Sequence, residues 1–167
     1  MLNKFFLSTL LMLVLFGCED STPKQIYVPQ AVTRDDIGYY CNMIVEDHSG
    51  PKGQILLTDT EEAIWFTSVR DAVAFNLLPE EPKNIGAVFV TAMDKAEWNH
   101  PEKLQSNWID AQSAFYVIKS SQRGSMGQME AIPFRQKQFA DEFVKKHGGD
   151  VVSYLEIPDN YILGSTN

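Results

Sequence analysis

The stretch MEAIPFRQKQFADEFVKKHGGDVVSYLEI, residues 129–157, decides the fold of the second half of the chain. Its apolar run at 129–134 predicts a strand. Apolar residues then recur at helical spacing over 136–147, where a basic last turn and a following glycine are typical of a helix C-terminus. Residues 151–157 predict another strand. The stretch therefore predicts a strand–helix–strand unit.

The same order of elements extends outward over the rest of the chain. In the second half, a strand at 114–118 and a loop at 122–127 precede the unit above. In the first half, the pattern predicts two strands, a helix and a third strand, at residues 39–45, 54–58, 68–78 and 85–92. The expected fold class is therefore α+β, with two small ββαβ-type units packed together. A single mixed α+β domain is the alternative.

The first eighteen residues indicate how the chain is targeted. Lys4 precedes an apolar run at 5–16, which ends in Gly17-Cys18. This pattern predicts a bacterial lipoprotein signal peptide over 1–17, with lipidation of Cys18. The run is too short for a membrane-spanning helix, which needs about 20 apolar residues. Acyl chains would hold the mature protein at the membrane surface.

The division of the chain follows from this signal and from the two units. Residues 18–36 are polar and contain two prolines, so they predict a lipid anchor and flexible tether. Residues 37–106 then form the first ββαβ unit and residues 107–167 the second. We expect the mature protein to lie outside the cytoplasm, anchored in the outer membrane in preference to the inner.

Composition and charge exclude several classes of protein. The 167 residues are 44% hydrophobic, which is enough for a packed core, and the net charge is −8. An acidic chain without a basic patch is poorly suited to nucleic acid. The motifs of P-loop proteins, of α/β-hydrolases and of H-E-x-x-H zinc enzymes are absent from the sequence.

Cys41 and Met43 are the first candidate metal ligands. In the strand predicted at 39–45, residues two apart share one face, so both sulfur atoms could reach one ion. A thiolate and a thioether are soft donors and favour Cu(I) over Mg²⁺ or Ca²⁺. Structural zinc normally takes four Cys or His ligands. The alternative is that both residues belong to the core of a strand, as such side chains commonly do.

Met126 is a further candidate ligand, because it lies between Gly124 and Gly127, where no packed element explains an apolar side chain. Neighbouring glycines would let the backbone present it at a loop tip or to a ligand. Met93 and Met129 fit core positions better. Among the histidines, His48 is a possible fourth ligand, His100 is expected to be solvated, and His147 fits a cation at a helix end.

Several motifs in order resemble the NosL family, the lipoprotein copper chaperones of nitrous oxide reductase maturation. The resemblance extends over nearly all of the mature chain. The motifs are Tyr40-Cys41-Asn42-Met43, residues 47–55 (DHSGPKGQI), residues 65–72 (WFTSVRDA), residues 107–111 (NWIDA), Met126-Gly127 and His147-Gly148-Gly149.

The resemblance implies a Cu(I)-binding periplasmic protein rather than an enzyme. Its partners would be nitrous oxide reductase, whose copper-sulfide centre receives the copper, and an ABC-type maturation complex. Cys41, Met43 and Met126 match the family's candidate copper ligands. The family's two ββαβ units are similar in fold to organomercurial lyase, in agreement with the element order above.

Two alternative functions stay open at this point. One is a thiol-dependent enzyme of the organomercurial lyase type, although the mature chain offers only one unacylated thiol. The other is a structural or docking lipoprotein without metal, in which Cys41 is a buried core residue. The exposure of Cys41 distinguishes this second alternative from a copper site.

Overall fold

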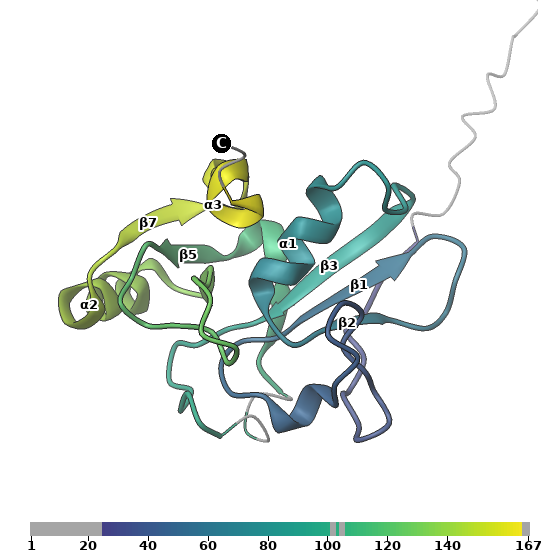
Figure 1. Cartoon of the computed structure of the whole chain (residues 1–167), viewed down its shortest axis with the longest axis horizontal. Coiled ribbons are helices and arrows are strands. Elements are labelled where there is room, and N and C mark those ends of the chain that lie inside the picture. Colours follow the sequence, from purple (N-terminus) through teal and green to yellow (C-terminus); the bar gives the residue numbers. More distant parts are fainter. Residues whose placement is uncertain (1–24, 101–102, 104–105, 165–167) are drawn as a thin grey trace, which may run out of the picture.

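The computed structural model describes residues 25–100, 103 and 106–164. In this part of the chain, two small antiparallel sheets each carry a helix (Figure 1). The strands are β1 (Gly53–Leu57), β2 (Ile64–Phe66), β3 (Ile85–Thr91), β4 (Trp108–Asp110), β5 (Phe115–Ile118), β6 (Ile132–Phe134) and β7 (Asp150–Ser153). The helices are α1 (Val69–Leu77), α2 (Lys137–His147) and α3 (Asp159–Leu163), with short 3-10 turns η1 (Val45–Asp47), η3 (Ala111–Ser113) and η4 (Tyr154–Glu156).

The first sheet has the strand order β2-β1-β3-β4 and is covered by α1. The helix begins where predicted, because the Ser68 hydroxyl accepts the Asp71 N–H at 3.1 Å and caps the first turn. Buried Ala72 and Phe75 of the helix then pack with Ile55 of β1 in one apolar cluster. This contact places α1 across the sheet (Figure 1).

The second sheet has the order β6-β5-β7 and is packed against α2. The Phe143 ring of this helix lies 5.4 Å from that of Phe134 on β6, and Ala140 is fully buried beside them. After His147 the chain turns through Gly148 at φ +66°, a left-handed conformation that glycine adopts easily. The predicted helix and its end are therefore confirmed.

A shared apolar cluster joins the two halves. Val73 of α1 and Val90 of β3 pack in one cluster with Tyr116, Tyr154 and Ile162 of the second half. The expected α+β fold, with two small ββαβ-type units packed together, is confirmed. The likeness to organomercurial lyase stays a prediction. The division between residues 106 and 107 also stays a prediction, and β4, which follows it, pairs with β3.

The strand predicted at 39–45 is wrong. Residues 39–41 form a turn, and Asn42 has a left-handed backbone (φ +54°) that interrupts an extended chain. The first unit keeps its ββαβ order because the unpredicted strand β2 pairs with β1. With only three residues, β2 shows no strand pattern of its own.

Two strands of the second half are shorter than predicted. Only the last three residues of 129–134 form β6, because Met129 pairs with Arg123 in an isolated bridge that closes a loop. The predicted strand 151–157 ends at Ser153, whose N–H and hydroxyl both donate to Glu156 at 2.8 Å. These bonds stabilise the 3-10 turn η4, so the strand does not continue beyond Ser153.

The flexible tether predicted over 18–36 is wrong for the residues around Gln30. The Gln30 N–H donates to Gln54 Oε1 at 2.8 Å, and the Gln54 amide donates back to the Gln30 carbonyl at 3.0 Å. Val32 is buried with Val45 and Trp65. This part of the segment is therefore packed on the first sheet.

The predictions for the N-terminus are not tested. The signal peptide at 1–17 and the lipidation site Cys18 lie outside the described residues. Among the helices that the structure does describe, none has the length and apolar character needed to cross a membrane.

Candidate metal site

Cys41 lies in a tight turn that is fixed by its backbone. The Gly38 N–H donates to the Met43 carbonyl and the Asn42 N–H to the Gly38 carbonyl, both at 2.9 Å. A further bond of 2.8 Å, from the Tyr39 N–H to the Trp65 carbonyl, ties the turn to β2. The turn that carries the thiol, residues 38–43, is called the Cys41 turn below.

The Cys41 thiol is half-buried and belongs to none of the core clusters. Its Sγ lies 3.5 Å from Thr67 Oγ1 and 3.9 Å from the Gly38 carbonyl oxygen. A Cβ on Gly38 would come within 2.6 Å of this sulfur, so glycine leaves the room that the thiol occupies. The alternative in which Cys41 is a buried core residue is therefore wrong.

Met43 lies at the end of the same turn and is 39% exposed. Because the turn is not a strand, Cys41 and Met43 do not share a strand face, and that reason for pairing them is wrong. Both side chains nevertheless reach the surface from one six-residue turn. An exposed thioether beside a half-buried thiol is a donor pair that suits a soft ion.

Glu81 supports the Cys41 turn from the loop between α1 and β3. Its two carboxylate oxygens accept the hydroxyl groups of Tyr39 and Tyr40, at 3.1 and 2.8 Å. The bond to Glu81 raises the pKa of Tyr39, and burial followed by the same bond raises that of Tyr40. The Tyr39 ring also packs edge-on against Phe75 of α1, 5.4 Å away. Glu81 and Phe75 of the first unit therefore hold the two tyrosines of the turn.

Met126 lies in a second exposed loop, as predicted. The Gly124 N–H donates to the Gln128 carbonyl and the Gly127 N–H to the Gly124 carbonyl, both at 2.9 Å. The Met126 side chain is 46% exposed. Gly127 has φ +82° and nothing within 4 Å of a Cβ position, so this side of the loop is open. Residues 124–128 are called the Met126 loop below.

The other two methionines in the described part of the chain, Met93 and Met129, have different outcomes. Met93 is 6% exposed and packs with Val117 and Phe134, so its predicted core position is confirmed. Met129 is 42% exposed, so its predicted core position is wrong. The bridge to Arg123 at the base of the Met126 loop keeps Met129 out of β6 and at the surface.

His48 joins the two halves of the candidate site. Its Nδ1 lies 3.1 Å from the hydroxyl of Ser125, the residue before Met126. Burial and the nearby Lys52 ammonium lower the pKa of His48, while Asp47 acts in the opposite direction. A neutral imidazole keeps a lone pair that a metal ion can use. The structure therefore brings the segment from Cys41 to His48 into contact with the Met126 loop.

The remaining histidines lie elsewhere. His100 Nε2 is 3.2 Å from Glu97 Oε2 in an exposed loop, and the His147 ring stacks on Phe143 at 4.3 Å, at the end of α2. Within residues 25–100, 103 and 106–164, no three side chains of His, Cys, Asp or Glu gather as a metal site would require.

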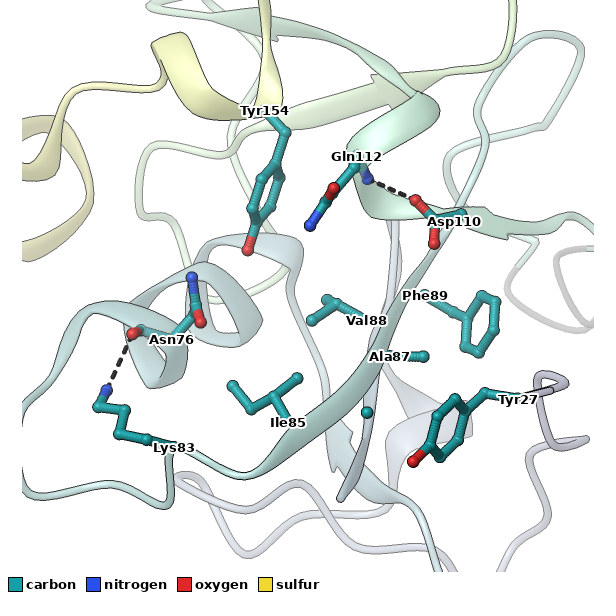
Figure 2. Close-up of a pocket in the computed structure, with 11 residues that line it drawn as sticks. Tyr27, Asn76, Lys83, Ile85, Ala87, Val88, Phe89, Asp110, Gln112 and Tyr154 are labelled. Atoms are coloured by element: carbon teal, nitrogen blue, oxygen red, sulfur yellow. Dashed lines mark hydrogen bonds between the residues drawn. The ribbon is translucent and has the colours of Figure 1, made fainter. Parts of the chain in front are cut away.

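A pocket of about 700 Å³ lies beside β3, away from these sulfur atoms. Figure 2 shows Tyr154 and Asn76 on one side of the strand and Tyr27 on the other, with Asp110 where β4 ends. The described residues that line it include no Cys, Met or His. The pocket is therefore separate from the candidate metal site.

Sequence reasoning missed three contacts of the candidate site: Thr67 beside the Cys41 thiol, Ser125 on His48, and Glu81 on the two tyrosines. Each partner is at least 26 residues away along the chain. Glu81 is one of two adjacent acids, a pattern typical of solvated surface, yet it is only partly exposed and accepts both tyrosine hydroxyls. Local patterns contain no signal for contacts of this range.

Comparison with known proteins defines the family. The model of the NosL family matches residues 29–162, which include the Cys41 turn and the Met126 loop. The chain belongs to the NosL family. This confirms the family resemblance seen in the sequence motifs. Two relatives are named copper-binding lipoprotein NosL. The one from Achromobacter cycloclastes is 37% identical over 96% of this chain and 82% of its own length, and the one from Stutzerimonas stutzeri is 33% identical over 90% and 77%.

Solved structures of NosL proteins share the fold. The crystal structure of the copper chaperone NosL from Shewanella denitrificans matches with a TM-score of 0.72 and 32% identity, over 81% of this chain and 96% of that one. The solution structure of apo-NosL from Achromobacter cycloclastes matches with a TM-score of 0.51 and 38% identity, over 66% and 88%. These relatives are named for copper binding and chaperone function, not for an enzymatic activity.

Proposed function

We propose that this chain is a lipid-anchored, periplasmic Cu(I) chaperone that delivers copper for assembly of the copper-sulfide centre of nitrous oxide reductase. Cys41, Met43 and Met126 hold the ion, and the acylated Cys18 holds the protein at a membrane, the outer membrane in preference to the inner. The partners are the reductase and its ABC-type maturation complex. The names of the NosL relatives support copper binding, chaperone function and the lipid anchor.

The observation that carries this proposal is the exposure of the sulfur donors. The Cys41 thiol is half-buried on one turn, and Met43 and Met126 are both more than one-third exposed. Soft donors select Cu(I) over hard cations. Ligands at the surface let an incoming sulfur or imidazole of a partner bind before the donor's own ligands leave, whereas a closed cage would retain the ion.

Anaerobic titration with Cu(I) against a competing chelator tests the proposal, on the full chain in detergent. Cys41→Ala is expected to abolish tight binding, a larger loss than the 10- to 100-fold typical of an outer-shell change. Met43→Ala and Met126→Ala are expected to weaken binding. Met129→Ala is the matched control, because Met129 is 42% exposed yet is not among the proposed ligands. Full affinity in Cys41→Ala would overturn the proposal.

Three further measurements test the finer parts of the proposal. X-ray absorption of the loaded protein counts sulfur neighbours, and at least two are expected. Competition with Zn²⁺ should leave Cu(I) bound, since the proposed donors are mostly thioether. Transfer to metal-free nitrous oxide reductase, with and without the maturation complex, tests delivery. Loss of Cu(I) to Zn²⁺ would contradict the soft site, and failure of transfer would contradict the delivery role alone.

A further inference from the structure

Glu130 is a buried carboxyl next to the Met126 loop that the copper ligands above do not use. Its side chain is 1% exposed, and Oε1 accepts two backbone N–H groups, from Arg70 at 2.8 Å and from Ala131 at 2.9 Å. Arg70 is in the first turn of α1, where N–H groups lack partners within the helix. Glu130 therefore joins the base of the Met126 loop to the start of a helix in the other half of the chain.

The second oxygen of Glu130 faces the Met126 loop itself. A Cβ on Gly124 would lie 3.2 Å from Glu130 Oε2 and 2.9 Å from Gln128 Nε2. The backbone of the loop thus rests directly on these two side chains. The Glu130 carboxyl therefore lies against the backbone at Gly124, which is two residues from Met126.

Lys52 has the equivalent role beneath the other half of the site. It is 3% exposed, and its Nζ donates to the carbonyls of Ser49 and Gly50 at 3.2 and 2.6 Å. Its own N–H donates to Thr91 Oγ1 at 2.8 Å, which anchors it to the first sheet. The ammonium therefore fixes the turn that follows His48.

The two buried groups interact electrostatically. Each charge favours the ionised form of the other, although burial opposes both. His48, in the segment that Lys52 holds, contacts Ser125, in the loop that Glu130 holds. Lys52 and Glu130 therefore each hold one of the two segments that meet at this contact.

We propose that Glu130 and Lys52 are positioning residues for copper: Glu130 holds the Met126 loop, Lys52 holds the turn after His48, and together they set the separation of the sulfur donors. Neither residue touches the ion. This inference rests on the proposed copper-binding function. If Glu130 had only a structural role, its substitution would lower the stability of the fold. Only a positioning role makes the effect of that substitution on Cu(I) affinity depend on the presence of Met126.

A double-mutant cycle separates the two roles. Glu130→Gln, nearly the same in shape, is expected to lower Cu(I) affinity about tenfold, as outer-shell changes do. In the Met126→Ala background it should cause no further loss. Exposed Glu142→Gln on α2 is the matched control and should keep full affinity. Equal losses in both backgrounds, or no loss in either, would overturn the inference.

A second readout does not need copper. In the metal-free full chain, Glu130→Gln should shift the NMR methyl resonance of Met126 and leave that of buried Met93 in place, and Lys52→Gln should shift the His48 ring resonances. If Glu130→Gln does not fold, Gly124→Ala perturbs the same contact from the loop side and should shift Met126 too. An unmoved Met126 methyl in the folded variant would contradict the inference.

These outcomes distinguish the inference from the function on which it rests. If Cys41→Ala keeps full affinity, the proposed function fails, whatever the methyl resonances show. If Cys41→Ala loses copper while the Glu130 cycle is additive, copper binding stands and only the positioning role fails.

Discussion

The Cys41 turn and the Met126 loop both present a sulfur atom at the surface, but they are held in different ways. The Cys41 turn is closed by its own backbone bonds and tied to β2, and its supporting side chains, Tyr39 and Tyr40, are exposed. The Met126 loop is open on one side and rests on the buried carboxyl of Glu130. Both segments have backbone bonds of their own, but the side chains that support the Cys41 turn lie near water, whereas the side chain that supports the Met126 loop is a titratable group in the interior.

The difference shows which properties of the site can change with conditions. Backbone hydrogen bonds between neutral groups do not titrate in the physiological range. A buried carboxyl does, because burial penalises its charged form. We therefore expect the Met126 loop to respond to pH and to charge substitutions, and the Cys41 turn to respond mainly to steric changes.

The largest expected effect is the pH dependence that Glu130 causes. Burial raises the pKa of Glu130 to about 8, from an ordinary value of 4.5. The folded protein then holds this proton more tightly than the unfolded chain. The stabilisation is complete below 4.5 and is lost as the pH rises towards about 8, with a slope of at most about 1.4 kcal/mol per pH unit. Denaturant unfolding across this range should show the decline in the natural protein and a flatter profile in Glu130→Gln.

Other groups near Glu130 do not remove this contrast. Burial also raises the pKa of Asp71 and lowers the pKa of Lys52, the buried partner of Glu130, to about 8. The lowered pKa values of Lys52 and His48 act in the opposite direction, above about 8 for Lys52 and just below 6.5 for His48, but all three groups are present in both proteins. The regional comparison is tested by hydrogen exchange, corrected for intrinsic rates. Protection of the Gly127 amide should fall towards pH 8 while that of Asn42 holds. Equal loss at both amides would remove the distinction between the two regions.

The next effect is steric and concerns the Cys41 turn. In Gly38→Ala the new Cβ would meet Cys41 Sγ at 2.6 Å and Thr67 Cγ2 at 2.9 Å, so the thiol must move. Overpacking of this kind costs about 1–3 kcal/mol. Unfolding by denaturant measures this loss, and a thiol reagent should label the displaced Cys41 faster.

Gly127→Ala is the matched change in the Met126 loop. Nothing lies within 4 Å of that Cβ, so only the left-handed backbone, φ +82°, opposes alanine, at a cost of about 1 kcal/mol. The rate of Cys41 labelling should not change in this variant. If Cys41 is labelled at the same rate in Gly38→Ala as in the natural protein, the thiol is not confined as the structure indicates.

Most regular elements were predictable from the sequence because their signals are local. The helix predicted at 68–78 is α1, the strand at 85–92 is β3, and the helix at 136–147 is α2, each correct to within a residue or so at either end. Helical spacing, the Ser68 cap and the glycine after His147 all act within a few residues. Such signals remain visible without knowledge of the tertiary structure.

The candidate site was predictable only in part, because its geometry depends on distant partners. Cys41 and Met126 are conspicuous in sequence, as a lone thiol and as a methionine between glycines. The strand predicted around Cys41 failed because Asn42 is left-handed and Tyr39 bonds to Trp65, a residue 26 positions later. Nothing near Glu130 in the sequence shows that its carboxyl meets Arg70 and Gly124.

A smaller effect is expected at the contact between the two regions. Ser125→Ala removes the hydroxyl that lies 3.1 Å from His48 Nδ1. The loss of one hydrogen bond of this kind costs about 1 kcal/mol. Unfolding by denaturant measures it, with exposed Ser121→Ala as the control. If His48→Ala lowers the free energy of unfolding by the same amount, and the double variant is no less stable than Ser125→Ala, the lost contact is the cause. Fully additive losses would contradict this explanation.

The smallest effect is expected at Glu81, where the surroundings are wet. Glu81→Gln removes the charge that both tyrosine hydroxyls approach, so the pKa of Tyr39 should fall towards 10, and that of Tyr40, which burial raises most, should fall less. A spectroscopic titration of phenolate measures this, with the neighbouring Glu80→Gln as control. Because the tyrosines are exposed, the free energy of unfolding should change by less than about 1 kcal/mol. If the variant also loses Cu(I) affinity, the Cys41 turn depends on side-chain support as the Met126 loop does, and the difference between the regions is one of degree.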